Sequence, residues 1–261
     1  MNARKTLAGV LGVAMAALWL GLGPGCGALS KPPKLTPPAV TPAPYGTPAE
    51  PVLWAVVPLR NESGTTVADP LRMSDKVVAA ISETPGLACL PVNRTLEAMR
   101  ALEMTSVGSP AEAQVLARTL GADGIIAGSI TAYDPYQPVL GLSLALFGTP
   151  GAMGAVEQKS LDAKRLTSSA TEPAATGPGN FQQRPLSVIS EHLDGKNHQV
   201  LVEVEAYAWG RSDPSSSLGW KRYVASMDLY EEFGAHHAVS SLIRLEWARI
   251  GGTPPGAGPK D

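Results

Sequence analysis

The sequence predicts an α/β domain, in which strands and helices alternate along the chain. Three stretches support this prediction. Trp54–Val57 is an apolar run of strand length, and Ile125–Ala132 is a second one. Between them, Ser109–Glu112 is a capping box with proline at the first helical position, which is typical of a helix start. Strands separated by helices in this way indicate an α/β fold.

The first strand leads into a polar turn. Pro58 lacks a backbone N–H and therefore suits the end of a strand. Gly64 can adopt positive φ and can close the turn that follows. We therefore expect the first strand to deliver a charged loop to one edge of the sheet, namely Arg60, Asn61, Glu62 and Ser63.

Helical spacing and capping residues define the elements between the two runs. Asp69–Glu83 has apolar residues at helical spacing, with Asp69 as its expected N-cap and proline in the first position. Leu87–Val92 is a short apolar strand, after which Asn93 is expected to cap a second helix. The third helix, which follows the capping box, is expected to end at Gly121.

Further strands and helices are expected in the second half of the chain. Tyr133–Pro138 is a turn, and Val139–Phe147 is expected to pair antiparallel with the preceding strand. Leu186–Ile189 is a short strand, while Val200–Trp209 fits a strand or a helix, with a helix favoured by the capping residues before it. A long closing helix is expected to start at the capping signature Asp228–Glu231 and to carry an apolar stripe of Phe233, Leu242, Ile243, Leu245 and Trp247.

The first 25 residues have the pattern of an export signal. Arg4 and Lys5 precede an apolar run that is short against the ~20 residues of a membrane-spanning helix. Gly25 and Cys26 resemble the lipobox of bacterial lipoproteins, which implies that Cys26 is acylated and becomes the first residue. Leu22 lies one position too early for that motif. Ordinary secretion, with cleavage after Ser30, and an uncleaved anchor therefore stay open as alternatives.

Residues 26–51 are expected to be a lipidated, proline-rich linker. Eight prolines between Ser30 and Pro51 predict polyproline II without a core, and a reach from Cys26 of very roughly 70 Å. The folded domain is expected to span 52–250. Within it, 148–185 lacks periodicity and is predicted to be a disordered insertion, and 251–261 is a flexible tail.

Two motifs of the domain resemble a known superfamily of envelope proteins. The first strand ends in Pro58 and a turn with Asn61, Ser63 and Gly64. The third helix ends in Leu-Gly-Ala-Asp (120–123), and a strand with a Gly-Ser pair (128–129) follows. Together they resemble the α/β domain shared by the curli-secretion lipoprotein, the penicillin-binding-protein activator lipoproteins and the amino-terminal domain of the Tol-system propeller protein.

This resemblance covers Val52 to about Phe147 and has consequences for fold and function. It implies a single mixed β-sheet flanked by helices, with the signal, lipoprotein leader and proline-rich tether in front of it. It also implies a role in assembling or activating an envelope machine. Gly27 in place of an aspartate after the lipidated cysteine favours an outer-membrane lipoprotein facing the periplasm.

Composition and motifs exclude several classes of function. The formal net charge is −2, and after residue 25 acidic side chains outnumber basic ones by 23 to 19, which argues against nucleic-acid binding. The sequence has no P-loop, no Gly-x-Ser-x-Gly elbow and no His-Glu-x-x-His. His236 and His237 are adjacent and would diverge on a helix, and Cys89 is expected to be buried and unreactive. We therefore predict no catalytic residues, no metal and no cofactor.

The remaining hypotheses differ in what the chain binds. The first is a non-catalytic, lipid-anchored protein that binds an envelope protein, with a homo-oligomer also open. Its binding face is expected at the sheet edge that carries Arg60, Asn61, Glu62, Ser63, Tyr133 and Tyr136. An envelope enzyme or a sugar-binding protein that uses the 133–138 and 148–185 loops is the alternative. A secretion-pore subunit is a minor alternative, because Val139–Phe147 is too uniformly apolar for a membrane hairpin.

Overall fold

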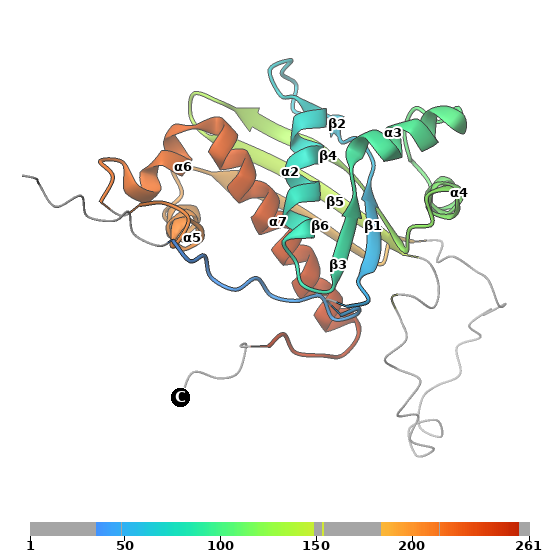
Figure 1. The fold of residues 1–261 in the computed structure, drawn as a ribbon. Helices are drawn as coiled ribbons and strands as arrows, with labels where there is room; N and C mark the ends of the chain where they lie inside the picture. The colour runs from blue at the N-terminus through green and yellow to red at the C-terminus, as the bar shows by residue number, and fades with distance from the viewer. Residues whose placement is uncertain (1–34, 48, 149–152, 154–183, 214, 256–261) are drawn as a thin grey trace, which may run out of the picture. The chain divides into compact units, whose positions relative to one another are not determined.

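A mixed sheet of six strands forms the centre of the domain (Figure 1). The structure is a computed structural model, and it describes residues 35–47, 49–148, 153, 184–213 and 215–255. The strand order is β3-β1-β4-β5-β6. The short strand β2 also pairs with β4, further along the same edge of β4 that pairs with β1. The strands are β1 (Val52–Val56), β2 (Arg60–Asn61), β3 (Leu87–Leu90), β4 (Gly124–Asp134), β5 (Val139–Gly148) and β6 (Ser187–Asp194).

Strand directions divide this sheet into two parts. β1 runs parallel to β3 and β4, and β2 runs parallel to β4. β5 is antiparallel to both β4 and β6. Parallel strands need crossover connections, and helices supply them here, whereas β4 and β5 are joined by a tight turn. The expected α/β fold with a mixed sheet is therefore confirmed.

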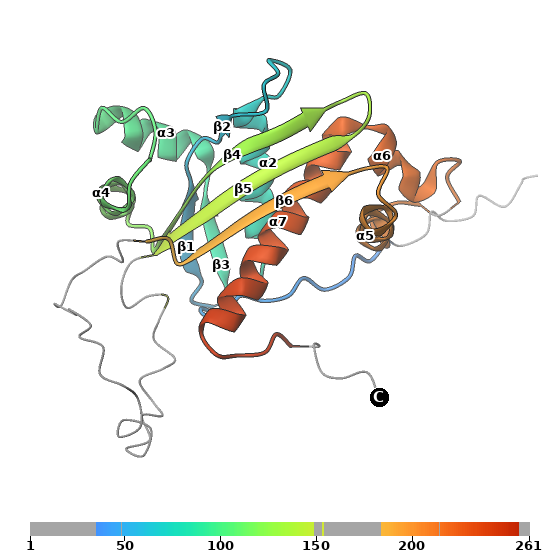
Figure 2. The same ribbon diagram turned by 180° about the vertical axis from the view of Figure 1, so that it is seen from behind.

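Helices cover the two faces of the sheet unequally (Figures 1 and 2). α2 (Pro70–Ser82) and α7 (Met227–Arg249) pack side by side on one face, over Ile126 and Ile130 of β4 and the leucines of β5. On the opposite face, α3 (Val92–Ala101) and α4 (Pro110–Leu120) cover only the part of the sheet near β1, around Ile125. The shorter elements are α5 (His198–Ala208), the 3-10 helix η2 (Gly219–Lys221) and α6 (Arg222–Ala225).

One face of β4, β5 and β6 has no helix over it in Figure 2. The register places small side chains side by side on this face. Ser129 lies opposite Ser143, which lies opposite Ser190, and Ala127 lies opposite Ala145. Gly128 allows β4 and β5 to approach closely here, because a Cβ on it would lie 2.1 Å from the Ser143 carbonyl oxygen. At these positions the uncovered face therefore carries only small side chains.

Most of the predicted helix ends are confirmed. Asp69 accepts hydrogen bonds from the backbone N–H of Leu71 and Arg72, and the Ser109/Glu112 capping box is complete. Gly121 ends α4 in the left-handed conformation, with φ of 65°. Asn197 caps α5, so Val200–Trp209 is helical for all but its last residue, as the capping residues favoured.

Two helix starts and several boundaries differ from the prediction. α3 begins two residues earlier than expected, with Pro91 instead of Asn93 at its N-cap, so that Val92 is helical and β3 stops at Leu90. α7 begins after Ser226, and the proposed capping signature lies inside its first turns. β6 extends to Asp194 because it stays in register with β5 from Ser187 to Asp194. Leu245 is 42% exposed and does not belong to the buried stripe of α7.

The proline-rich stretch packs on the domain, contrary to the expectation that it forms no core. We call residues 35–47 the strap. Within the strap, Ala43 and Tyr45 are buried, and the Tyr45 ring lies 6.2 Å from that of Trp54. The Pro42 carbonyl accepts a hydrogen bond of 2.9 Å from the Trp247 indole. Proline removes donors but leaves carbonyls and apolar rings free, so such a stretch can still dock on a folded surface.

Several predictions lie outside the described residues. These are the signal peptide and Cys26, most of the 148–185 insertion and the end of the tail. Within the described ranges we find no helix whose length and apolarity would suffice for a transmembrane span.

Replacing Tyr45 with alanine tests whether the strap belongs to the core. Tyr45 is 8% exposed, so Tyr45→Ala should lower the free energy of unfolding by about 3 kcal/mol. Leu35→Ala, at the exposed end of the strap, should change it by less than about 0.5 kcal/mol. Denaturant melts of both variants measure this, and equal stabilities would show that the strap only lies against the domain.

The thiol of Cys89 should react slowly in the native state. Burial raises the pKa of this thiol to about 12, so very little thiolate exists at neutral pH. In a Cys26→Ser background, a thiol reagent at pH 7.5 should label Cys89 many-fold faster after denaturation than before. Fast labelling of the native chain would contradict the placement of β3 against the core.

Candidate functional site

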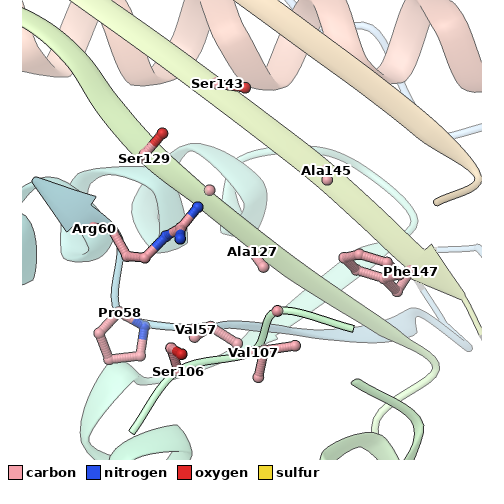
Figure 3. Close-up of a pocket in the computed structure, with 12 residues that line it drawn as sticks. Val57, Pro58, Arg60, Ser106, Val107, Ala127, Ser129, Ser143, Ala145 and Phe147 are labelled. Carbon is pink, nitrogen blue, oxygen red and sulfur yellow. The ribbon is translucent and has the colours of Figure 1, made fainter. Parts of the chain in front are cut away.

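A groove of about 210 Å³ opens on the uncovered face of the sheet (Figure 3). It lies where β4 and β5 meet the end of β1 and the loop before α4. Figure 3 shows the side chains that surround it: Val57, Pro58, Arg60, Ser106, Val107, Ala127, Ser129, Ser143, Ala145 and Phe147. Residues from four separate segments of the chain therefore form one concave surface.

The groove combines an apolar floor with hydroxyl groups and one cation. Val57, Val107 and Phe147 are buried, since they also pack in the smaller core beside α4. Ser129 and Ser143 face each other across the β4–β5 register, and Ser106 is exposed on the loop before α4. Arg60 extends over β4 in Figure 3. Such a surface can bind a small apolar group with a carboxylate beside it.

The backbone pairing of β2 positions Arg60 at the groove, whereas its side chain makes only a weak ion pair. β2 pairs with β4, and Arg60 lies opposite Ser129. The guanidinium contacts the Glu62 carboxylate at 3.0 Å, but the two side chains are 62% and 46% exposed. An exposed pair of this kind contributes little stability, so Arg60 can exchange Glu62 for another anion at low cost.

Asn61 and Ser63 hold the loop that follows β2. The Asn61 amide donates to the carbonyls of Thr65 and Ala68, at 2.6 and 3.4 Å. Its oxygen accepts from the backbone N–H and the hydroxyl of Ser63, at 3.1 and 2.6 Å. Both side chains are therefore engaged within their own loop, which explains these residue types without any partner.

Tyr133 lies on the opposite face of the sheet from the groove. A register shift between Ile130 and Ala132 leaves Tyr133 opposite Leu140, among the residues under α2 and α7. Its hydroxyl donates to Glu231 Oε1 at 2.7 Å, and Arg72 Nη2 lies 3.2 Å from the same hydroxyl. Burial is the main cause that raises the pKa of Tyr133 to about 12, and the hydrogen bond to Glu231 is the second. The neutral hydroxyl is thus part of the fold.

The predicted site residues are therefore not assembled into one site. β1 and β4 are parallel, as expected, and the loop after β2 and the β4–β5 turn lie at the same end of the sheet (Figure 2). Arg60, however, belongs to the groove, whereas Tyr133 is committed to Glu231. Tyr136 is 92% exposed at the tip of the β4–β5 turn, while Tyr133 and Trp220 pack against the core.

Sequence reasoning missed the serines of the groove. β5 was predicted as uniformly apolar, yet large and small residues alternate along it. Its four leucines enter the core under α2 and α7, and Gly141, Ser143 and Ala145 lie between them in sequence. Strict alternation by size was the available signal, because successive strand residues point to opposite faces.

The two adjacent histidines have different environments. The ring of His236 lies 4.9 Å from that of Tyr207, and burial lowers the pKa of His236 to about 4. His237 lies between Glu203 and Glu191, with N–O distances of 3.1 and 3.5 Å. Among the residues that the structure describes, no three His, Cys, Asp or Glu side chains come together in a way that could hold a metal ion.

Solved structures similar in fold to this chain come from several bacteria, and one of them is a lipoprotein by name. The LpoB C-terminal domain from Salmonella enterica is 10% identical with a TM-score of 0.38, over 59% of this chain and 87% of that one. Lipoprotein GNA1162 from Neisseria meningitidis is 17% identical with a TM-score of 0.39, over 60% and 93%. The PelC dodecamer from Paraburkholderia phytofirmans is 13% identical with a TM-score of 0.34, over 82% and 96%.

LpoB belongs to the penicillin-binding-protein activator lipoproteins, which is one of the groups that the sequence motifs resemble. No family model matches the chain, and no curated protein matches it. At these identities and TM-scores, we transfer no residue role and no partner from these proteins to this chain.

Removing the cation next to Glu231 tests whether this cluster is structural. The Glu231 side chain is 2% exposed and lies 2.7 Å from Arg72, which is 43% exposed. Arg72→Met should lower the free energy of unfolding by about 2 kcal/mol, because it leaves a buried carboxylate without its cation. Arg94→Met breaks an exposed pair and should cost less than about 0.5 kcal/mol. Equal denaturant midpoints for the two variants would refute the structural role.

Proposed function

We propose that this chain is a non-catalytic, lipid-anchored protein of the bacterial cell envelope. In this proposal, Cys26 carries the acyl anchor at the outer membrane and the domain faces the periplasm. The domain binds a protein partner through the groove beside Arg60, and thereby helps to assemble or activate an envelope machine. The observation that carries the proposal is the groove itself, which has an apolar floor, hydroxyl groups and one exchangeable cation.

The groove is suited to a short extended segment of a partner. Its floor is narrow and is lined by small side chains on β4 and β5, which leaves room for one apolar side chain at a time. Hydroxyl groups of Ser106 and Ser143 can meet backbone or side-chain polar groups, and Arg60 can pair with a carboxylate. A buried apolar centre with a polar, charged rim is the usual composition of a protein interface.

Tyr136 extends the proposed binding surface beyond the groove. Among the residues that the structure describes, it is the most exposed large apolar side chain, and the turn that carries it is at the same end of the sheet as the loop after β2. Tyrosine and arginine frequently dominate interface energetics. In this proposal Asn61 and Ser63 shape the loop, Glu62 neutralises Arg60 in the free protein, and Tyr133 stabilises the fold.

An envelope enzyme or a sugar-binding protein is the second candidate. Hydrolytic enzymes of this kind rely on paired carboxylates or an activated nucleophile next to a base. None of the residues that line the groove is His, Cys, Asp or Glu. Its chemistry therefore favours binding over catalysis, and we place the chain among partner-binding proteins.

A photo-reactive amino acid in the groove tests the proposed partner site. Introduced at Ser143, it should cross-link one defined envelope protein in living cells, because this position faces the groove. At Val115, an exposed position on α4, it should not cross-link that protein. Adding Arg60→Glu to the Ser143 probe should reduce the yield by about tenfold or more, since charge reversal repels a carboxylate.

The melting temperature of each variant serves as the control for folding. Arg60→Ala combined with Tyr136→Ala should also keep its melting temperature and lose the partner. Cross-linking that persists in the Arg60→Glu chain, or that is equal at both probe positions, would show that the groove is not the binding site.

A further inference from the structure

Helix α5 carries apolar side chains on two opposite sides. Val200, Val204 and Ala208 are buried against the domain. On the outer side, Val202 is 44% exposed, Ala206 is exposed, and Trp209, which directly follows the helix, is 73% exposed. These three outer residues are four and three positions apart, so they form one stripe along the helix. A short helix that is apolar on both sides indicates that something covers its outer stripe.

The strap begins beside this outer stripe. Thr36 lies against Gly210, where an added Cβ would be 2.1 Å from the Thr36 carbonyl oxygen. Pro38 and Ala39 of the strap line a pocket together with Ala206 of α5. Leu35, the first residue that the structure describes, is 42% exposed next to these contacts. Figure 1 shows the start of the strap next to α5. We call Leu35, Val202, Ala206 and Trp209 the α5 corner.

The chain length before the strap restricts what can cover the α5 corner. Nine residue steps separate Cys26 from Leu35, and a chain of that length spans at most about 30 Å however it is arranged. Because the strap is packed on the domain, the prolines within the strap do not lengthen the connection between Cys26 and the domain. If Cys26 is acylated, Leu35 at the α5 corner therefore lies no more than about 30 Å from the bilayer that holds the acyl chains.

The chemistry of the α5 corner fits the polar–apolar boundary of a membrane. Tryptophan is enriched at that boundary, because its ring is apolar and its N–H is polar. Charges around the corner are mixed: Glu205 is exposed on α5, Lys221 and Arg222 are exposed on the elements that contact α5, and Glu203 and Arg211 line the pocket beside Ala206. The α5 corner is thus no polybasic patch, and attraction to anionic lipids is not required.

We propose that the α5 corner rests on the surface of the lipid bilayer, with Trp209 at the level of the headgroups. This inference rests on the proposed acylation of Cys26. It sets the orientation of the domain: α5 faces the membrane, and the acyl anchor and Trp209 together form a two-point attachment. Two attachment signals hold a protein on a membrane more firmly than one.

Quenching of tryptophan emission by brominated lipid tests this orientation. The full chain, purified from envelopes, is placed on phosphatidylcholine vesicles with and without bromine on the acyl chains, and flotation confirms attachment. After removal of 1–25, the tryptophans are Trp54, Trp209, Trp220 and Trp247. We expect brominated lipid to quench part of the emission, Trp209→Phe to abolish that quenching, and Trp220→Phe to retain it. High salt should leave the quenching unchanged.

The possible results separate this inference from the proposed function. A chain that does not float with the vesicles lacks the acyl anchor, which overturns both. A chain that floats but shows no quenching, or quenching that persists in Trp209→Phe, overturns the α5 contact alone and leaves the anchor in place. Trp209 would then be available to a protein partner. The melting temperature of Trp209→Phe should equal that of the wild type, because the side chain is exposed.

Discussion

The alternation of side-chain size along β4 and β5 is the constraint on which the rest of this structure depends. Ile126, Ile130 and the leucines of β5 point toward α2 and α7 and build the main core, whereas Ile125 and Phe147 pack in the smaller core beside α4. Small residues between the core-facing ones, such as Ser129, Ser143 and Ala145, form the uncovered face. Because a strand has a period of two, the same register determines the core on one face and the groove on the other.

Polar clamps join the helices to this sheet at its two ends. Near the β4–β5 turn, Glu231 of α7 binds Arg72 of α2 and Tyr133 of β4. At the opposite end, Glu246 of α7 accepts a hydrogen bond from Ser187 at the start of β6 and pairs with Arg249. Glu231 and Glu246 are buried, and burying a carboxylate is costly unless cations and donors surround it. The clamps therefore specify the position of α7 more than they add net stability.

The strap changes where the domain begins. Composition places the boundary at residue 52, after the last proline of the linker, yet Ala43 and Tyr45 are part of the core. Packing of the strap brings the start of the domain to the outer surface of α5 and shortens the free connection to Cys26. In the proposed membrane attachment, the orientation of the domain would then depend on a packed segment rather than on a long flexible tether. The groove and the α5 corner are formed by different elements, so the proposed membrane attachment and the proposed partner binding are compatible with each other.

Local sequence is sufficient to predict several features of this protein. The Asp69 cap, the Ser109/Glu112 box and the Gly121 end are hydrogen-bonded within a few residues, so local sequence is enough to predict them. The antiparallel pairing of β4 and β5 follows in the same way from the tight turn between two strand-forming runs. The mixed sheet could be expected as well, since motifs at both ends of its parallel half resemble those of a known superfamily.

Only the tertiary structure decided which distant residues meet. Trp247 and Pro42 are 205 positions apart, and Arg72 and Glu231 are 159 apart, so no periodicity or motif links them. Tyr133 is an example: its position in sequence suggested an exposed loop, but a one-residue register shift in β4 turned it toward the core. The groove likewise needed Arg60, Ser106 and Ser143 to be brought together by three separate segments. Local sequence determines the helix caps and the tight turns, whereas packing between distant elements determines which side chains remain at the surface.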